Sequence, residues 1–89
     1  MKKKTMKLTA AEQAWLTRLN EVLAECPSPR LGFFTIGDPS IHVFDKRREQ
    51  EANTMMEEKH RDFGLCCEEL GILSPRSILF PSAVHSTAG

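Results

Sequence analysis

The densest apolar pattern of the chain lies in residues 31–44, where two runs of aromatic and β-branched residues flank a short polar segment. Residues of these types are enriched in β-strands. The polar segment contains Gly37, Asp38 and Pro39. Asp accepts a hydrogen bond from the backbone two residues on, Pro fixes φ for a turn, and Gly tolerates a positive φ. The pattern therefore predicts a β-hairpin with its turn at residues 37–40.

Neither arm of the predicted hairpin has a polar face. Successive side chains of a strand point to opposite sides, whereas a strand with one face in water alternates apolar with polar residues. We therefore expect both faces to be covered, one by a helix of this chain and the other by the C-terminal segment, a second copy or a partner protein. The candidate protein-binding residues are Phe33, Phe34, Ile36, Ile41, Val43 and Phe44.

The segment before the hairpin has the pattern of an amphipathic helix. Thr9 and Glu12 match a capping box, which predicts that the helix begins at residue 10. Apolar residues then recur every three or four positions, and Pro27 ends the helix. We expect this stripe to lie across one side of the hairpin, with Trp15 as its largest member. The stripe comprises Ala11, Trp15, Leu19, Val22, Leu23 and Cys26.

A second helix is expected after the hairpin, and two signals compete for its start. Asp45 and the apolar spacing that begins at Ala52 favour a start near residue 46. A second capping-box pattern at residues 54–57 favours a later one. The end is better specified, because Gly71 stands where a left-handed residue closes a helix.

These elements predict an α+β fold, in the order helix, β-hairpin, helix (αββα), with a short C-terminal segment packed on the hairpin. That segment, residues 78–80, would add a third strand or cover the hairpin. The length of the chain suits one domain. We expect this domain at residues 8–80, a basic disordered tail at 1–7 and a flexible tail at 81–89. The expected core is Trp15, Leu19, Leu23, Phe33 or Phe34, Val43, Phe63 and Leu70.

The formal net charge of zero conceals a basic start and an acidic body. Four of the twelve basic residues lie in the first seven positions. There is no apolar segment typical of a secretory signal, and no run approaches the roughly 18 apolar residues of a membrane span. Three cysteines, two of them adjacent, do not form an ordinary disulfide framework. We therefore expect a reduced, cytoplasmic protein.

Common catalytic and cofactor motifs are missing from the sequence: there is no Gly-rich phosphate loop, no paired CxxC, no HExxH and no GxSxG. A nucleophilic enzyme would need a cysteine beside a histidine and an orienting acid. We expect no catalysis, no metal, no cofactor and no small-molecule substrate. The side chains that a metal site would have to use match no familiar zinc spacing; they are His42, His60, His85, Cys26, Cys66 and Cys67.

Two non-enzymatic functions remain. Protein binding, by a partner or by self-association in a homodimer, is favoured by the two-sided hairpin and by adaptable Met55 and Met56. Nucleic-acid association is the alternative, through contacts of basic residues with phosphates. The acidic second helix and the lack of interleaved aromatic and basic residues speak against it. Its candidate residues are Lys2, Lys3, Lys4, Lys46, Arg47 and Arg48, together with Lys7.

The block KLTAAEQAWLTRLNEVLAECPSPRLGFFTIGDPSIHVFD, residues 7–45, resembles small accessory proteins carried by lambda-like phages and prophages of enteric bacteria. The shared features are a helix, a C-P-S loop and a G-F-F-T-I-G-D-P hairpin. The resemblance contains no catalytic motif and assigns no site residues. It implies a non-essential phage protein, expressed in the host cytoplasm, that modulates a host or phage protein.

Overall fold

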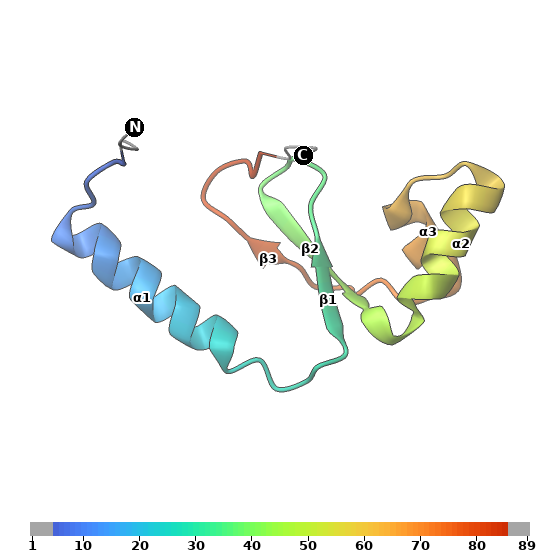
Figure 1. The fold of residues 1–89 in the computed structure, drawn as a ribbon, viewed down its shortest axis with the longest axis horizontal. Helices are drawn as coiled ribbons and strands as arrows, with labels where there is room; N and C mark the ends of the chain where they lie inside the picture. The colour runs from blue at the N-terminus through green and yellow to red at the C-terminus, as the bar shows by residue number, and fades with distance from the viewer. Residues whose placement is uncertain (1–4, 86–89) are drawn as a thin grey trace.

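The computed structural model describes residues 5–85 and arranges them along one long axis (Figure 1). Helix α1 (Ala10–Ala24) lies at one end, a three-stranded sheet in the middle, and helices α2 (Glu49–Lys59) and α3 (Phe63–Leu70) at the other end. The radius of gyration is 16.3 Å, whereas a compact domain of this length has about 12 Å. The protein is therefore elongated, and α1 projects away from the sheet.

The sheet is antiparallel in the order β1-β2-β3. Strands β1 (Leu31–Phe34) and β2 (Ser40–Asp45) form the predicted hairpin, with Phe34 opposite His42. Strand β3 (Ile78–Leu79) pairs with the other edge of β2. The C-terminal segment therefore adds a third strand, which decides between the two alternatives. Helices together with an antiparallel sheet confirm the α+β class.

The turn of the hairpin uses the predicted residues. Gly37 has a φ of +90°, a conformation in which residues with a Cβ are strained. One carboxylate oxygen of Asp38 accepts a hydrogen bond from the backbone N–H of Ser40 at 3.0 Å. This is the local bond by which Asp favours turns.

The segment after β3 is also joined to this turn. The backbone N–H of Phe80 donates to the carbonyl of Pro39 at 2.8 Å, and that of Val84 donates to the carbonyl of Asp38 at 3.1 Å. Residues 1–4 and 86–89 lie outside the described part of the chain. Four of the seven residues of the predicted basic tail and four of the nine residues of the predicted C-terminal tail lie there, and both tails stay predictions.

The hydrophobic core fills the space between one face of the sheet and the helices α2 and α3. The Phe63 ring meets the rings of Phe34 and Phe44 edge-on, with centroid distances of 5.2 and 5.0 Å. Aromatic rings prefer this geometry to face-to-face stacking. One face of the hairpin is therefore covered by its own chain. The buried residues are Phe44, Ala52, Cys66, Cys67 and Ile72, and around them pack Phe34, Met55, Met56, Phe63, Leu70 and Leu73.

The first helix forms as predicted but does not cover the hairpin. Thr9 and Glu12 exchange both bonds of the capping box, and the helix begins at Ala10. None of the residues in α1 is buried, and the side chains of Trp15 and Leu23 are 46% and 48% exposed. The expectation that these two belong to the core is wrong. Helical periodicity identifies an apolar stripe, but it does not say what covers that stripe.

The second helical region begins at the earlier of the two proposed starts. The Asp45 carboxylate accepts a hydrogen bond from the backbone N–H of Arg47 at 3.1 Å and caps the short 3₁₀ helix η1 (Lys46–Arg48). Helix α2 follows directly from Glu49. The capping-box pattern at residues 54–57 therefore lies inside α2 and does not mark the start of a helix.

A break that was not predicted divides this region in two. His60 adopts a left-handed φ of +53° and ends α2. Asp62 then caps α3 by accepting a hydrogen bond from the backbone N–H of Leu65 at 2.8 Å. The break turns α3 back toward α2, so that both Cys66 and Cys67 are buried. The end of α3 is as predicted: Gly71 has a φ of +73°, and the next N–H donates to the carbonyl of Cys67.

We expect Gly32→Ala to destabilise the protein and Gly64→Ala to stabilise it. A Cβ at Gly32 would lie 2.6 Å from two ring carbons of buried Phe44, and overpacking of this kind costs about 1–3 kcal/mol. A Cβ at Gly64 would lie 3.7 Å from its nearest neighbours, and replacing Gly inside a helix contributes about 0.5–1 kcal/mol. Urea unfolding of both variants and the wild type measures the difference. Equal midpoints for the two variants would contradict the packing described.

Candidate protein-binding site

The face of the sheet that points away from α2 and α3 forms one wall of an apolar groove. Side chains of β1 and β2 alternate as predicted, so Phe33, Ile41 and Val43 lie on the side opposite Phe34 and Phe44. The C-terminal part of α1 forms the other wall. The groove has a volume of about 500 Å³. The sheet contributes Leu31, Phe33, Ile41, Val43 and Ile78, α1 contributes Leu19, Val22 and Leu23, and Cys26 and Phe80 complete the lining.

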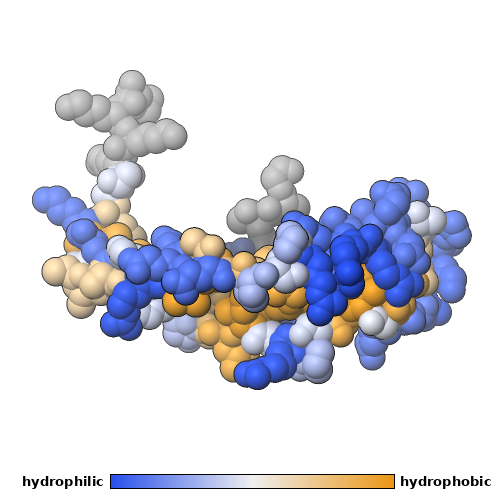
Figure 2. Space-filling model, turned by 90° about the horizontal axis from the view of Figure 1, so that it is seen from below, coloured by the Kyte–Doolittle hydropathy of each residue, from blue (hydrophilic) through white to orange (hydrophobic). Residues whose placement is uncertain are grey.

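This lining is apolar throughout. Pockets for small molecules combine apolar walls with a few polar groups that orient the ligand, and the described residues supply no charged or amide side chain here. Figure 2 shows hydrophobic residues gathered over the middle of the molecule, while hydrophilic residues dominate the end formed by α2 and α3. The groove therefore presents an apolar surface without a charged or amide side chain to orient a polar ligand.

The six residues predicted to bind a protein fall into three places. Phe33, Ile41 and Val43 line the groove. Phe44 is buried and Phe34 packs against it, so the structure removes both from the candidate site, because α2 and α3 already cover their face of the sheet. The remaining residue, Ile36, lies in the hairpin loop outside the groove and is 70% exposed.

Sequence reasoning missed the contribution of α1 to this site. Helical periodicity predicts the apolar stripe that contains Leu19, Val22 and Leu23, but it places this stripe across the hairpin as part of the core. Cys26, the last member of the same stripe, is exposed at the groove. The stripe alone could not distinguish these outcomes, since a helix face that awaits a partner has the same periodicity as one that is covered.

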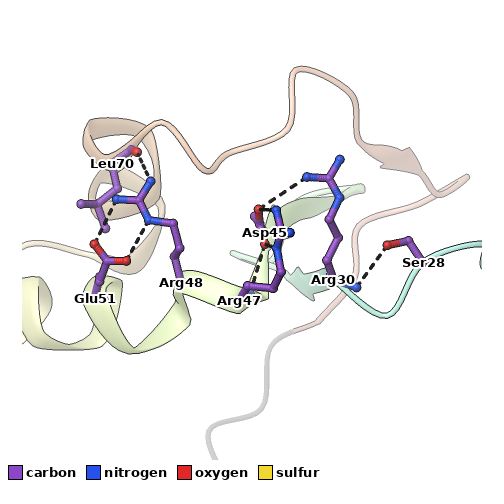
Figure 3. A network of polar contacts seen from close by, with 7 residues as sticks. All are labelled: Ser28, Arg30, Asp45, Arg47, Arg48, Glu51 and Leu70. Atoms are coloured by element: carbon purple, nitrogen blue, oxygen red, sulfur yellow. Dashed lines mark hydrogen bonds and ion pairs between the residues drawn. The ribbon is translucent and has the colours of Figure 1, made fainter.

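Asp45 binds two arginines at the junction between the hairpin and α2 (Figure 3). Its carboxylate accepts hydrogen bonds from the Arg47 side chain at 2.7 and 3.0 Å, and from Nη1 of Arg30 at 3.5 Å. The hydrogen bonds from the Arg47 guanidinium hold the pKa of Asp45 well below its usual range. Charge-assisted bonds of this kind are stronger than neutral ones, and they fix the point at which the chain leaves the sheet.

The second arginine of η1 is also paired. Arg48 donates to the carboxylate of Glu51 at 2.8 and 3.0 Å and to the carbonyl of Leu70 at 3.2 Å (Figure 3). The pairing with Glu51 raises the pKa of Arg48 and lowers that of Glu51. A phosphate would therefore have to compete with carboxylates for both Arg47 and Arg48. Lys46 is exposed, and the candidates Lys2, Lys3 and Lys4 lie outside the described residues.

The residues considered for a metal or a nucleophile are scattered. His42 stacks on Phe34, His60 ends α2 and His85 is exposed, while Cys66 and Cys67 are buried in the core. Within residues 5–85 no three His, Cys, Asp or Glu side chains form a group that could hold a metal ion. Burial, with a smaller contribution from Cys66, raises the pKa of the Cys67 thiol to about 11. Because only the thiolate is nucleophilic, Cys67 is unreactive near neutral pH.

Comparisons of the protein with family models, with curated proteins and with solved structures found no match. No helix in residues 5–85 combines the length and the apolar character needed to cross a membrane. The function must therefore be inferred from the geometry of the groove and of the elements around it.

We expect Cys66 and Cys67 to resist a thiol reagent such as DTNB while the protein is folded. Both are buried, whereas Cys26 is exposed at the groove of the single chain. In Cys26→Ser no thiol should titrate rapidly at pH 7.5, and both remaining thiols should titrate after unfolding in urea. Rapid labelling of the folded Cys26→Ser variant would contradict the burial of Cys66 and Cys67.

The ion pairs of Asp45 should make stability fall in acid. Its pKa is lower in the folded state than the unfolded value of about 3.9. Its contribution is therefore complete above about pH 4 and is lost as the pH falls toward the folded pKa. The free-energy difference between wild type and Asp45→Asn should shrink from pH 5 to pH 2, measured by urea unfolding. Glu57 makes no ion pair within residues 5–85, so the difference for Glu57→Gln should change less; equal slopes would refute this role of Asp45.

Proposed function

We propose that this protein is a non-enzymatic interaction module that binds a protein surface through the apolar groove between α1 and the sheet. The observation that carries this proposal is the pairing of two exposed apolar surfaces, one on a helix and one on a sheet, across the same groove. Contiguous exposed apolar surface marks interaction sites in soluble proteins. The bound surface would belong to a host protein, to a phage protein or to a second copy.

The state of α1 supports this proposal. An isolated helix of about 15 residues is marginal in water, and most helical stability in proteins comes from packing an apolar face. Helix α1 has 15 residues and an apolar stripe, yet none of its residues is buried. A protein bound in the groove would cover the stripe and supply the missing packing.

The same features disfavour the other functions. The groove has no polar group that could orient a substrate, and Cys66 and Cys67 are buried. We therefore propose no enzymatic activity, no cofactor and no small-molecule substrate. Nucleic-acid association through Lys46, Arg47 and Arg48 is less favoured, because carboxylates already engage both arginines.

The cellular setting is inferred from chemistry and resemblance. Three free cysteines suit a reducing compartment. We therefore place the protein in the cytoplasm, which is the host cytoplasm if the chain is phage-encoded. A binding role without catalysis fits the phage accessory proteins that residues 7–45 resemble.

A photocrosslinking amino acid at position 33 tests the proposal. Benzoylphenylalanine in place of Phe33 should form covalent adducts with protein in cells, because this side chain faces the groove. The matched control is the same substitution at Leu65 on α3. Both native side chains are 49% exposed, but only Phe33 lines the groove. Adducts should be abundant at position 33 and rare at position 65; equal yields at both positions, or none at 33, would overturn the proposal.

A further inference from the structure

We propose that the groove is occupied by α1 of a second copy of this chain. The protein would then be a two-fold symmetric dimer in which the α1 of each copy packs into the groove of the other. This inference rests on the proposed function of the groove and names its occupant. It follows from the exposed surface area of the chain, from the complementarity of the apolar side of α1 and the groove, and from the segment that joins α1 to β1.

The exposed area is sufficient for a stable dimer. The chain has an accessible surface of 7533 Å² at a mass of 10.0 kDa, whereas a compact monomer of this mass exposes about 5,200 Å². Even if the eight residues outside the described range were fully exposed, at about 160 Å² each, an excess of about 1,000 Å² would remain. A protein interface of standard size buries about 800 Å² on each partner. The excess therefore matches one such interface.

A second copy covers both unsatisfied surfaces in a single contact. The groove lies beside the C-terminal half of α1, and within residues 5–85 it leaves Trp15 and Leu16, in the N-terminal half of this helix, exposed. If α1 of one copy enters the groove of the other, two-fold symmetry requires the reverse contact as well. Trp15 and Leu16 are then buried together with Phe33. An unrelated protein would need two separate apolar surfaces, one for the groove and one for Trp15 and Leu16, to bury the same residues.

The connection between α1 and β1 presents the helix for such an exchange. Only residues 25–30 join them, with Pro27 and Pro29 restricting the backbone. The Cys26 thiol and the Arg30 N–H each bond to Ser28, at 3.4 and 3.3 Å. This short and restrained segment holds α1 at the rim of its own groove instead of against the sheet. Exchange of an identical element between two copies is a low-cost route to a dimer.

Sedimentation of the full chain tests this inference. We expect a dimer, with twice the 10.0 kDa mass of the chain, at micromolar concentration. Leu23→Glu should raise the dimer dissociation constant at least about a hundredfold, because it places an unpaired charge in an apolar interface. Leu65→Glu on α3 is the control. The two leucines are 48% and 49% exposed, but only Leu23 lines the groove. Circular dichroism of both variants verifies that they fold.

Contacts between copies identify the exchanged helix. In a dimer mixed from isotope-labelled and unlabelled chains, we expect intermolecular nuclear Overhauser effects between the Leu16 methyl groups and the Phe33 ring. A dimer that forms without these contacts, or that Leu23→Glu leaves intact, would overturn the inference. A monomer whose position 33 crosslinks only to a different protein would also overturn the inference. That result would still support the proposed interaction module. A monomer without any adduct at position 33 would overturn both proposals.

Discussion

The structure depends on one mismatch: the hairpin has apolar side chains on both faces, and the described part of the chain covers only one of them tightly. On the covered face, Phe34 and Phe44 meet Phe63 in edge-on aromatic contacts at 5.0–5.2 Å. On the other face, Phe33 is half exposed beside a helix that buries none of its residues. Because burial of apolar surface is the main favourable term in folding, the first face holds the fold together, whereas the second face is left partly exposed.

Two local features and one hydrogen bond between distant residues bring α2 and α3 onto the face that they cover. Asp45 caps η1 and binds Arg47 at the end of β2, so the chain turns directly from the sheet into α2. The break at His60 reverses its course, and Arg48 links η1 to the last turn of α3. These contacts bring two short helices onto one face of the sheet and leave neither of them for the opposite face.

The chemistry of the side chains agrees with a protein that acts by binding. Buried Cys67 has a raised pKa and is therefore neutral, and the arginines of η1 serve the fold through carboxylate pairs. What the molecule presents outward is an apolar groove and an uncovered helix stripe. Covering such a surface with another apolar surface is favourable, by about 25 cal/mol per Å² buried. The elongated form of the chain agrees with the proposed dimer.

Features that depend on neighbouring residues could be predicted from the sequence. The capping box at Thr9, the Asx turn at Asp38, the left-handed Gly71 and the alternation of Phe33 with Phe34 all follow from backbone geometry within a few positions. The α+β class follows from these local elements. For α2, two local signals conflicted; in the structure Asp45 caps the earlier start, and Ala52 of the first turns of α2 is buried in the core.

Which apolar face lies against which was decided by the tertiary structure. The burial of Phe44 depends on contacts with residues distant in sequence, such as Phe63 and Ala52, whereas Trp15 stays 46% exposed. A hydrophobic stripe has the same periodicity whether it faces its own sheet, a partner or water. Sequence therefore determined the first helix, the hairpin with its turn and the end of α3, and that both hairpin faces are apolar. Only the three-dimensional packing assigned Phe34 and Phe44 to the core, and Phe33, Ile41, Val43 and α1 to the groove.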